Sequence, residues 1–118
     1  MTLHNQKWSI PDPERWKHPE RVSTKRMVDT LNEIRTAREQ MQDLKYDLNT
    51  RIEAKQRTMI SVWHTAYTQQ MHEFERELTA LTKEVTRLNR LIQTCTQREE
   101  FMASMLEMLK VQVDDRSQ

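Results

Sequence analysis

Residues 67–95 read YTQQMHEFERELTALTKEVTRLNRLIQTC, and this stretch decides the fold. Its apolar positions recur alternately four and three residues apart without a miss, which is the spacing of one face of an α-helix. We call this stripe the second seam; it consists of Tyr67, Met71, Phe74, Leu78, Leu81, Val85, Leu88, Ile92 and Cys95. After a polar core position at Glu99, the rhythm resumes with Met102, Leu106, Leu109 and Val113.

The helix is expected to extend far beyond this stretch. The chain of 118 residues has no glycine, and its three prolines all lie within the first nineteen residues. Glycine and proline are the residues that most often end helices and form tight turns. We therefore predict one long helix over residues 20–113, or two helices with a subtle joint near Thr96, and a polar tail at 114–118. The motif Thr96-Gln97-Arg98-Glu99 matches a capping box, which is the reason for placing a joint there.

A first seam runs along residues 27–59. Its apolar positions are Met27, Leu31, Ile34, Met41, Leu48, Ile52 and Met59. Arg38 and Lys45 fall on strict heptad core positions, so the stripe drifts and does not favour a simple parallel two-stranded zipper. The two seams are out of phase, which predicts a change of register or of partner somewhere in residues 52–67.

The composition favours a helix that is exposed on most of its surface. Apolar residues make up 36% of the chain and charged residues 31%, against about 45–50% and about 25% in ordinary domains. An unbroken helix over residues 20–113 would be roughly 140 Å long. We therefore predict an all-α protein in a coiled-coil or helical-bundle assembly, whose apolar face is covered by other chains and which is not a stable isolated monomer.

The junction between the seams has an unusual composition. Residues 58–72 read TMISVWHTAYTQQMH and contain no Asp, Glu, Lys or Arg. A helix without charge on its outer side is usually surrounded by other protein. We therefore predict that this segment, with Ile60, Trp63 and Tyr67, is the most enclosed part of the molecule. A local redirection of the apolar stripe is the alternative.

Residues 1–19 form a different kind of sequence, an extended docking arm. Trp8, Ile10 and Trp16 follow no helical or strand period, and a Pro-punctuated tail offers them no local core. Tryptophan is enriched at binding hot spots, so we predict that the arm docks onto another protein. The alternative is a flexible tail whose Trp residues have no binding role. Asp12 is expected to cap a short turn at Pro13, and Pro19 to open the long helix.

Catalytic and cofactor chemistry is not expected. His64 and His72 are eight residues apart, about 12 Å along a helix, which is too far to share a metal. Cys95 has no Cys or His companion at ligand spacing and is expected to be a buried small side chain. Without glycine there is no phosphate-binding loop. We predict no enzyme, no cofactor and no metal.

Nucleic acid and membrane are not expected as partners either. The formal net charge is +1, and the Lys and Arg residues ahead of the first seam are too few for a basic-region zipper. No run approaches the roughly 20 apolar residues of a membrane span, and the N-terminus lacks the apolar core of a signal peptide. A single cysteine favours a reducing, cytoplasmic compartment.

The run Glu73-Phe74-Glu75-Arg76-Glu77-Leu78, continuing through Leu81, Glu84 and Leu88 with Trp63 upstream, resembles the tektins. A short Trp/Pro arm before a long helix is also similar to small helical proteins inside ciliary doublet microtubules. The chain is shorter than a tektin and lacks the Asn/Cys-containing loop of that family. The resemblance implies a non-catalytic structural coiled coil of the cytoskeleton that packs on tubulin or other filaments of the axoneme.

Two other functions remain open: a helical adaptor or tethering subunit of a soluble complex, and a regulatory binding module that acts through its Trp tail. For all three, the same protein-interaction residues are predicted. They are Trp8, Ile10, Trp16, Ile60, Trp63, Tyr67, Met71, Phe74, Leu78, Leu81, Val85, Leu88, Ile92, Met102, Leu106 and Leu109.

Overall fold

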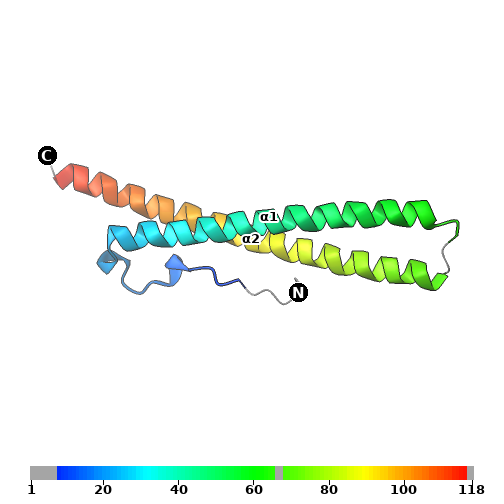
Figure 1. The fold of residues 1–118 in the computed structure, drawn as a ribbon. Helices are drawn as coiled ribbons and strands as arrows, with labels where there is room; N and C mark the ends of the chain where they lie inside the picture. Colours follow the sequence, from blue (N-terminus) through cyan, green and yellow to red (C-terminus); the bar gives the residue numbers. More distant parts are fainter. Residues whose placement is uncertain (1–7, 66–67, 117–118) are drawn as a thin grey trace. The chain divides into compact units, whose positions relative to one another are not determined.

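The structure, a computed structural model, describes the backbone of residues 8–65 and 68–116 and side chains as far as residue 110. Two short 3-10 turns, η2 (Pro13–Arg15) and η3 (Pro19–Arg21), precede two long helices, α1 (Thr24–Val62) and α2 (Thr68–Arg116) (Figure 1). These described ranges contain no strand. The all-α class is confirmed, and so is the alternative with two helices.

The interruption lies between Val62 and Thr68, so the joint predicted near Thr96 is wrong. Thr96 sits inside α2, where its hydroxyl donates to the carbonyl of Ile92 at 3.0 Å. At the end of α1, Ser61 Oγ donates to the carbonyl of Thr58 at 2.8 Å, and both the amide and the hydroxyl of Thr65 donate to the carbonyl of Val62. These hydroxyls satisfy carbonyls that a helix end leaves free, so the helix ends without glycine or proline.

Helix α1 begins later than predicted. Pro19 opens only a 3-10 turn, because Val22 after it is extended, with φ −81° and ψ 131°. The helix starts after Ser23, whose hydroxyl accepts the amide of Arg26 at 3.1 Å and so caps the N-terminus. The predicted turn at Pro13 is confirmed, but Asp12 makes no capping bond there and instead pairs with Arg15 at 3.2 Å.

Contacts divide the chain into two units, each built from a segment of both helices. We call residues 41–91 the turn unit, and residues 8–40 with 92–116 the arm unit. In the turn unit, Lys55 of α1 pairs with Glu77 of α2 on the way back from the turn. In the arm unit, Leu31 of α1 packs with Met102 of α2, and Arg38, further along α1, contacts Glu99, which comes earlier in α2. The helix segments are therefore antiparallel within each unit.

The core of the arm unit joins both helices and the N-terminal segment. Met27, Leu31 and Met102 are buried together, and the half-buried side chains packed on them are Trp16, Val22, Met105, Leu106 and Leu109. Two expectations are therefore wrong. Trp16 does have a local core to enter, and here the first and second seams cover one another within the chain rather than being left to other chains.

Truncating Met102, which is 0% exposed, leaves a cavity in this core. We expect Met102→Ala to lower the free energy of unfolding by about 2–5 kcal/mol. Met108 lies less than two turns further along α2 and is 63% exposed, so Met108→Ala is the matched control and should change stability by less than about 0.5 kcal/mol. Urea denaturation of the two variants measures the difference; equal losses would mean that the core lies elsewhere.

Candidate protein-interaction surfaces

An ion pair joins α1 and α2 in the arm unit. Arg38 of α1 donates to Glu99 of α2 through Nε at 2.5 Å and through a terminal nitrogen at 3.1 Å, which is a two-point contact. Arg35 Nε lies 3.4 Å from the same carboxylate. The Arg38 and Glu99 side chains are 27% and 13% exposed. The hydrogen bond to Glu99 raises the pKa of the Arg38 guanidinium, against an opposing effect of burial.

Cys95 lies one turn before Glu99 and is 0% exposed. Burial raises the pKa of its thiol, and the nearby negative charge of Glu99 raises it further, while Arg98 and Arg38 act in the opposite direction. A thiol with a raised pKa and no exposed surface is a poor nucleophile. The prediction of a buried small side chain at Cys95 is confirmed.

The N-terminal segment is held onto the helices mainly by Arg98. One terminal nitrogen of Arg98 donates to the carbonyls of Ile10 and Pro11 at 2.9 and 3.3 Å, and the other lies 3.5 Å from the carboxylate of Asp12. The guanidinium of Arg26 lies over the Trp16 ring, 5.4 Å from its centroid. Within the arm unit this segment is therefore docked onto its own chain.

Trp8 and Ile10 are half-buried on this docked segment. The Trp8 indole nitrogen is buried and has no hydrogen-bond partner among the described residues. A role for Trp8, Ile10 and Trp16 in binding another protein stays a prediction.

The charge-free segment is exposed in this chain. Ile60 is 69% exposed and Trp63 is 59% exposed, so this chain does not itself enclose the segment. The Trp63 ring lies 4.1 Å from the ring of His64, centroid to centroid. Tyr67 lies outside the described residues. Contact of this segment with another protein stays a prediction.

The remaining predicted residues all lie on α2 and are buried to different degrees. Leu88 and Met102 are 0% exposed. The half-buried ones are Met71, Phe74, Leu78, Leu81, Val85, Ile92, Leu106 and Leu109. Every one of these side chains thus contributes to the packing of its own chain, and most of them keep some surface open.

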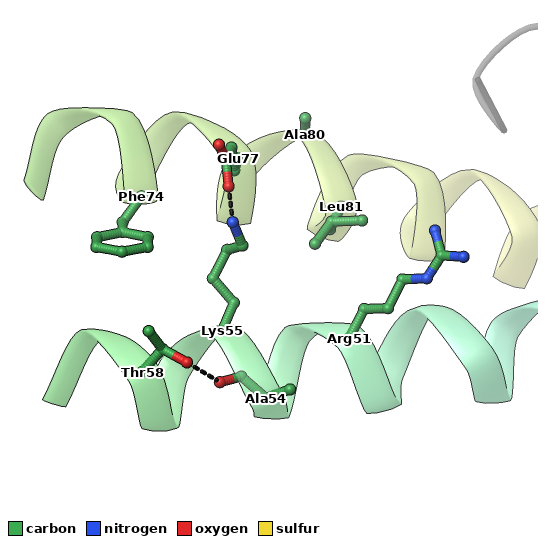
Figure 2. Close-up of a pocket in the computed structure, with 8 residues that line it drawn as sticks. All are labelled: Arg51, Ala54, Lys55, Thr58, Phe74, Glu77, Ala80 and Leu81. Carbon is green, nitrogen blue, oxygen red and sulfur yellow. Dashed lines mark hydrogen bonds and ion pairs between the residues drawn. The ribbon is translucent and has the colours of Figure 1, made fainter. Parts of the chain in front are cut away.

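A hollow of about 550 Å³ lies on the turn unit between α1 and α2 (Figure 2). Phe74 and Leu81 project into it from α2, and the carboxylate of Glu77 meets the ammonium group of Lys55 across it. The Lys55 ammonium also lies 5.3 Å from the centroid of the Phe74 ring. The remaining lining residues are Arg51, Ala54, Thr58 and Ala80.

No group of three or more His, Cys, Asp or Glu side chains that could hold a metal occurs in the described part of the chain. Neither described helix carries a window apolar enough to cross a membrane.

Sequence reasoning missed the residues that join the elements. Arg38 and Glu99 were each recognised as a polar residue on an apolar seam, but not as partners. The signal was available, because opposite charges at the core positions of two helices can pair if the chain turns back between them. The bond from Arg98 to backbone carbonyls had no signal, since it depends on the path of the N-terminal segment.

Removing one partner of the central ion pair should cost more than removing both. Glu99→Leu leaves the Arg38 guanidinium without its two-point acceptor, and we expect a loss of about 1–3 kcal/mol in the free energy of unfolding. Arg38→Leu/Glu99→Leu replaces the pair by apolar contact and should return close to wild-type stability. Urea denaturation of both variants gives the comparison. Additive losses in the double variant would show that the two side chains do not act as a pair.

Comparisons with known proteins assign the chain to no group: no family model, no curated protein and no solved structure matches it.

Proposed function

We propose that this chain is a non-catalytic structural protein that braces a larger helical assembly and attaches to it through the end of α1. The exposure of Ile60 and Trp63, in a segment of fifteen residues without a charged side chain, is the observation that carries the proposal. Large apolar side chains grouped on a surface mark sites of protein contact.

The polar groups of this segment strengthen the argument. The hydroxyls of Thr58, Ser61 and Thr65 donate to backbone carbonyls of α1 and of its end. These three hydroxyls therefore donate within the chain, and the large apolar side chains exposed beside them are Ile60 and Trp63. Tryptophan in such a setting is the residue most enriched among binding hot spots.

The resemblance to tektins is the basis for proposing a particular assembly. The run from Glu73 to Leu78, which carries that resemblance, lies in the first turns of α2, in the same unit as Trp63. We propose a ciliary doublet microtubule as the assembly, with tubulin or neighbouring helical filaments as partners, and a cytoskeletal location. The alternative function, an adaptor of a soluble complex, would use the same surface of the chain but in a different location in the cell.

The test combines location with a loss of attachment. A tagged chain expressed in ciliated cells should co-localise with the axoneme and remain with it after detergent extraction. Ile60→Glu/Trp63→Glu should reduce the retained fraction at least about tenfold, because two hot-spot side chains are replaced by charges. Quantitative fluorescence of extracted axonemes measures it.

Tyr46 provides the matched control, since it is an exposed aromatic side chain on α1, at 73% exposure, outside the charge-free segment. Tyr46→Glu should be retained like the wild type. Equal retention of the Ile60/Trp63 variant would overturn the proposed attachment site. A wild-type chain that never reaches the axoneme would overturn the ciliary assignment.

A further inference from the structure

The apolar seam of the turn unit is left open. Over residues 49–65 and 68–87, Glu84 is the one buried residue among those described. The apolar seam positions are all half-buried there; they are Ile52, Met59, Val62, Met71, Phe74, Leu78, Leu81 and Val85. Met41, Leu48 and Leu88 of this unit are 0% exposed, but between Leu48 and Leu88 the two helices alone leave the apolar seam partly open to water.

Lys55 explains why the seam stays open. It occupies a position between Ile52 and Met59 where the three-four rhythm calls for an apolar side chain. Its stem spans the gap to reach Glu77, and the flanking Ala54 and Ala80 are too small to fill the space on that side. The hollow thus has Phe74 and Leu81 as its large apolar lining residues.

The two walls of the hollow carry opposite charge. In segment 51–58 of α1, the charged side chains that line the hollow are Arg51 and Lys55, which are both basic. In segment 74–81 of α2, the charged side chain that lines the hollow is Glu77, which is acidic. The pair between Lys55 and Glu77 places these two segments at the same height along the helices. A surface with one basic and one acidic wall at one height is complementary to a copy of itself.

We propose that a second copy of this chain docks on this hollow, with α1 of each copy beside α2 of the other and both turns at the same end. A two-fold axis parallel to the helices keeps the heights of both copies equal, so each basic segment meets the acidic segment of the other copy. The alternative, α1 beside α1, would bring Arg51 and Lys55 of the two copies, all basic, to the same contact.

Arg51 and Glu77 form the specific contact between the copies. Arg51 lies one helical turn before Lys55, about 6 Å along the axis, and lines the hollow. Its side chain is long enough to reach Glu77 of the second copy, which stands at the height of Lys55. Glu77 is 54% exposed while paired with Lys55, so its carboxylate still offers acceptor positions. The two-fold axis makes this contact twice.

Docking also covers the floor of the hollow. The half-buried Phe74 and Leu81 of each copy pass from water into a four-helix core. It further brings the exposed Trp63 of both copies to one end, where two attachment points would act together. The dimer itself does not rest on the function proposed above.

The test is a mixing experiment on the full chain, with sedimentation equilibrium as the readout. The wild type should have the mass of two chains. Arg51→Glu places like charges together at both contacts, and so does Glu77→Lys, so each variant alone should dimerise at least about tenfold more weakly. A one-to-one mixture should recover the dimer, because it restores Glu–Lys at one contact and keeps Arg–Glu at the other.

Mixing separates this contact from effects within one chain. Glu77→Lys also breaks the pair with Lys55, but that pair is partly exposed and worth little to stability. Mixing cannot repair it, whereas it does repair the contact between copies. Circular dichroism checks that each variant is helical. Glu75→Lys makes the same charge change two residues away, about 200° around α2, and should dimerise like the wild type.

Three results would overturn the proposal. One is a wild-type chain that stays monomeric up to about 100 μM, an affinity too weak for a specific dimer. The second is a mixture of the two helical variants that dimerises no better than either alone. The third is a Glu75→Lys chain that loses the dimer as fully as Glu77→Lys does, which would trace the loss to charge in general.

Discussion

The ion pair between Arg38 and Glu99 is the contact on which the packing of the arm unit depends. Each side chain interrupts an apolar seam, and each is partly withdrawn from water. Sliding one helix past the other by a turn would break the two-point contact and leave the half-buried Arg38 guanidinium without its carboxylate, which is costly. The two-point geometry therefore selects one register, and that register brings Met27 and Leu31 to Met102. In this setting a polar core pair acts as a means of alignment.

The same unit shows how a short N-terminal segment can be ordered without regular structure. The backbone carbonyls of Ile10 and Pro11 take part in no helix or sheet hydrogen bond within the described part of the chain. The guanidinium of Arg98 donates to both of them instead. Trp16 packs its apolar ring on the core, and the guanidinium of Arg26 lies over that ring as a cation–π contact. The turn unit is built differently, with an open seam, a Lys–Glu pair across a hollow and an exposed Trp63. The arm unit buries Met27, Leu31 and Met102 together, whereas the seam of the turn unit near the turn is only half-buried.

Helix content and the core positions of the seams could be predicted from periodicity alone, because the spacing of residues such as Leu88 and Met102 records which face is buried. The location of the turn could not, because the argument relied on glycine and proline. Here the hydroxyls of Ser61 and Thr65 donate hydrogen bonds to backbone carbonyls at the end of α1, so the helix ends without glycine or proline. The absence of charge over residues 58–72 marked an unusual segment, but it did not show that the chain turns there between Val62 and Thr68 or that Ile60 and Trp63 are exposed in the chain itself.

The central claim is that α1 and α2 of one chain cover each other. The most direct measurement is a disulfide between Met27→Cys and Met102→Cys in a Cys95→Ala background, formed by mild oxidation in a mixture of ¹⁴N- and ¹⁵N-labelled chains. Met27 and Met102 belong to one buried cluster, so mass spectrometry should find linked peptides of a single isotope only. Linked peptides that combine the two isotopes, formed in proportion to the mixing ratio, would show that another chain covers the seam and would contradict the fold described above.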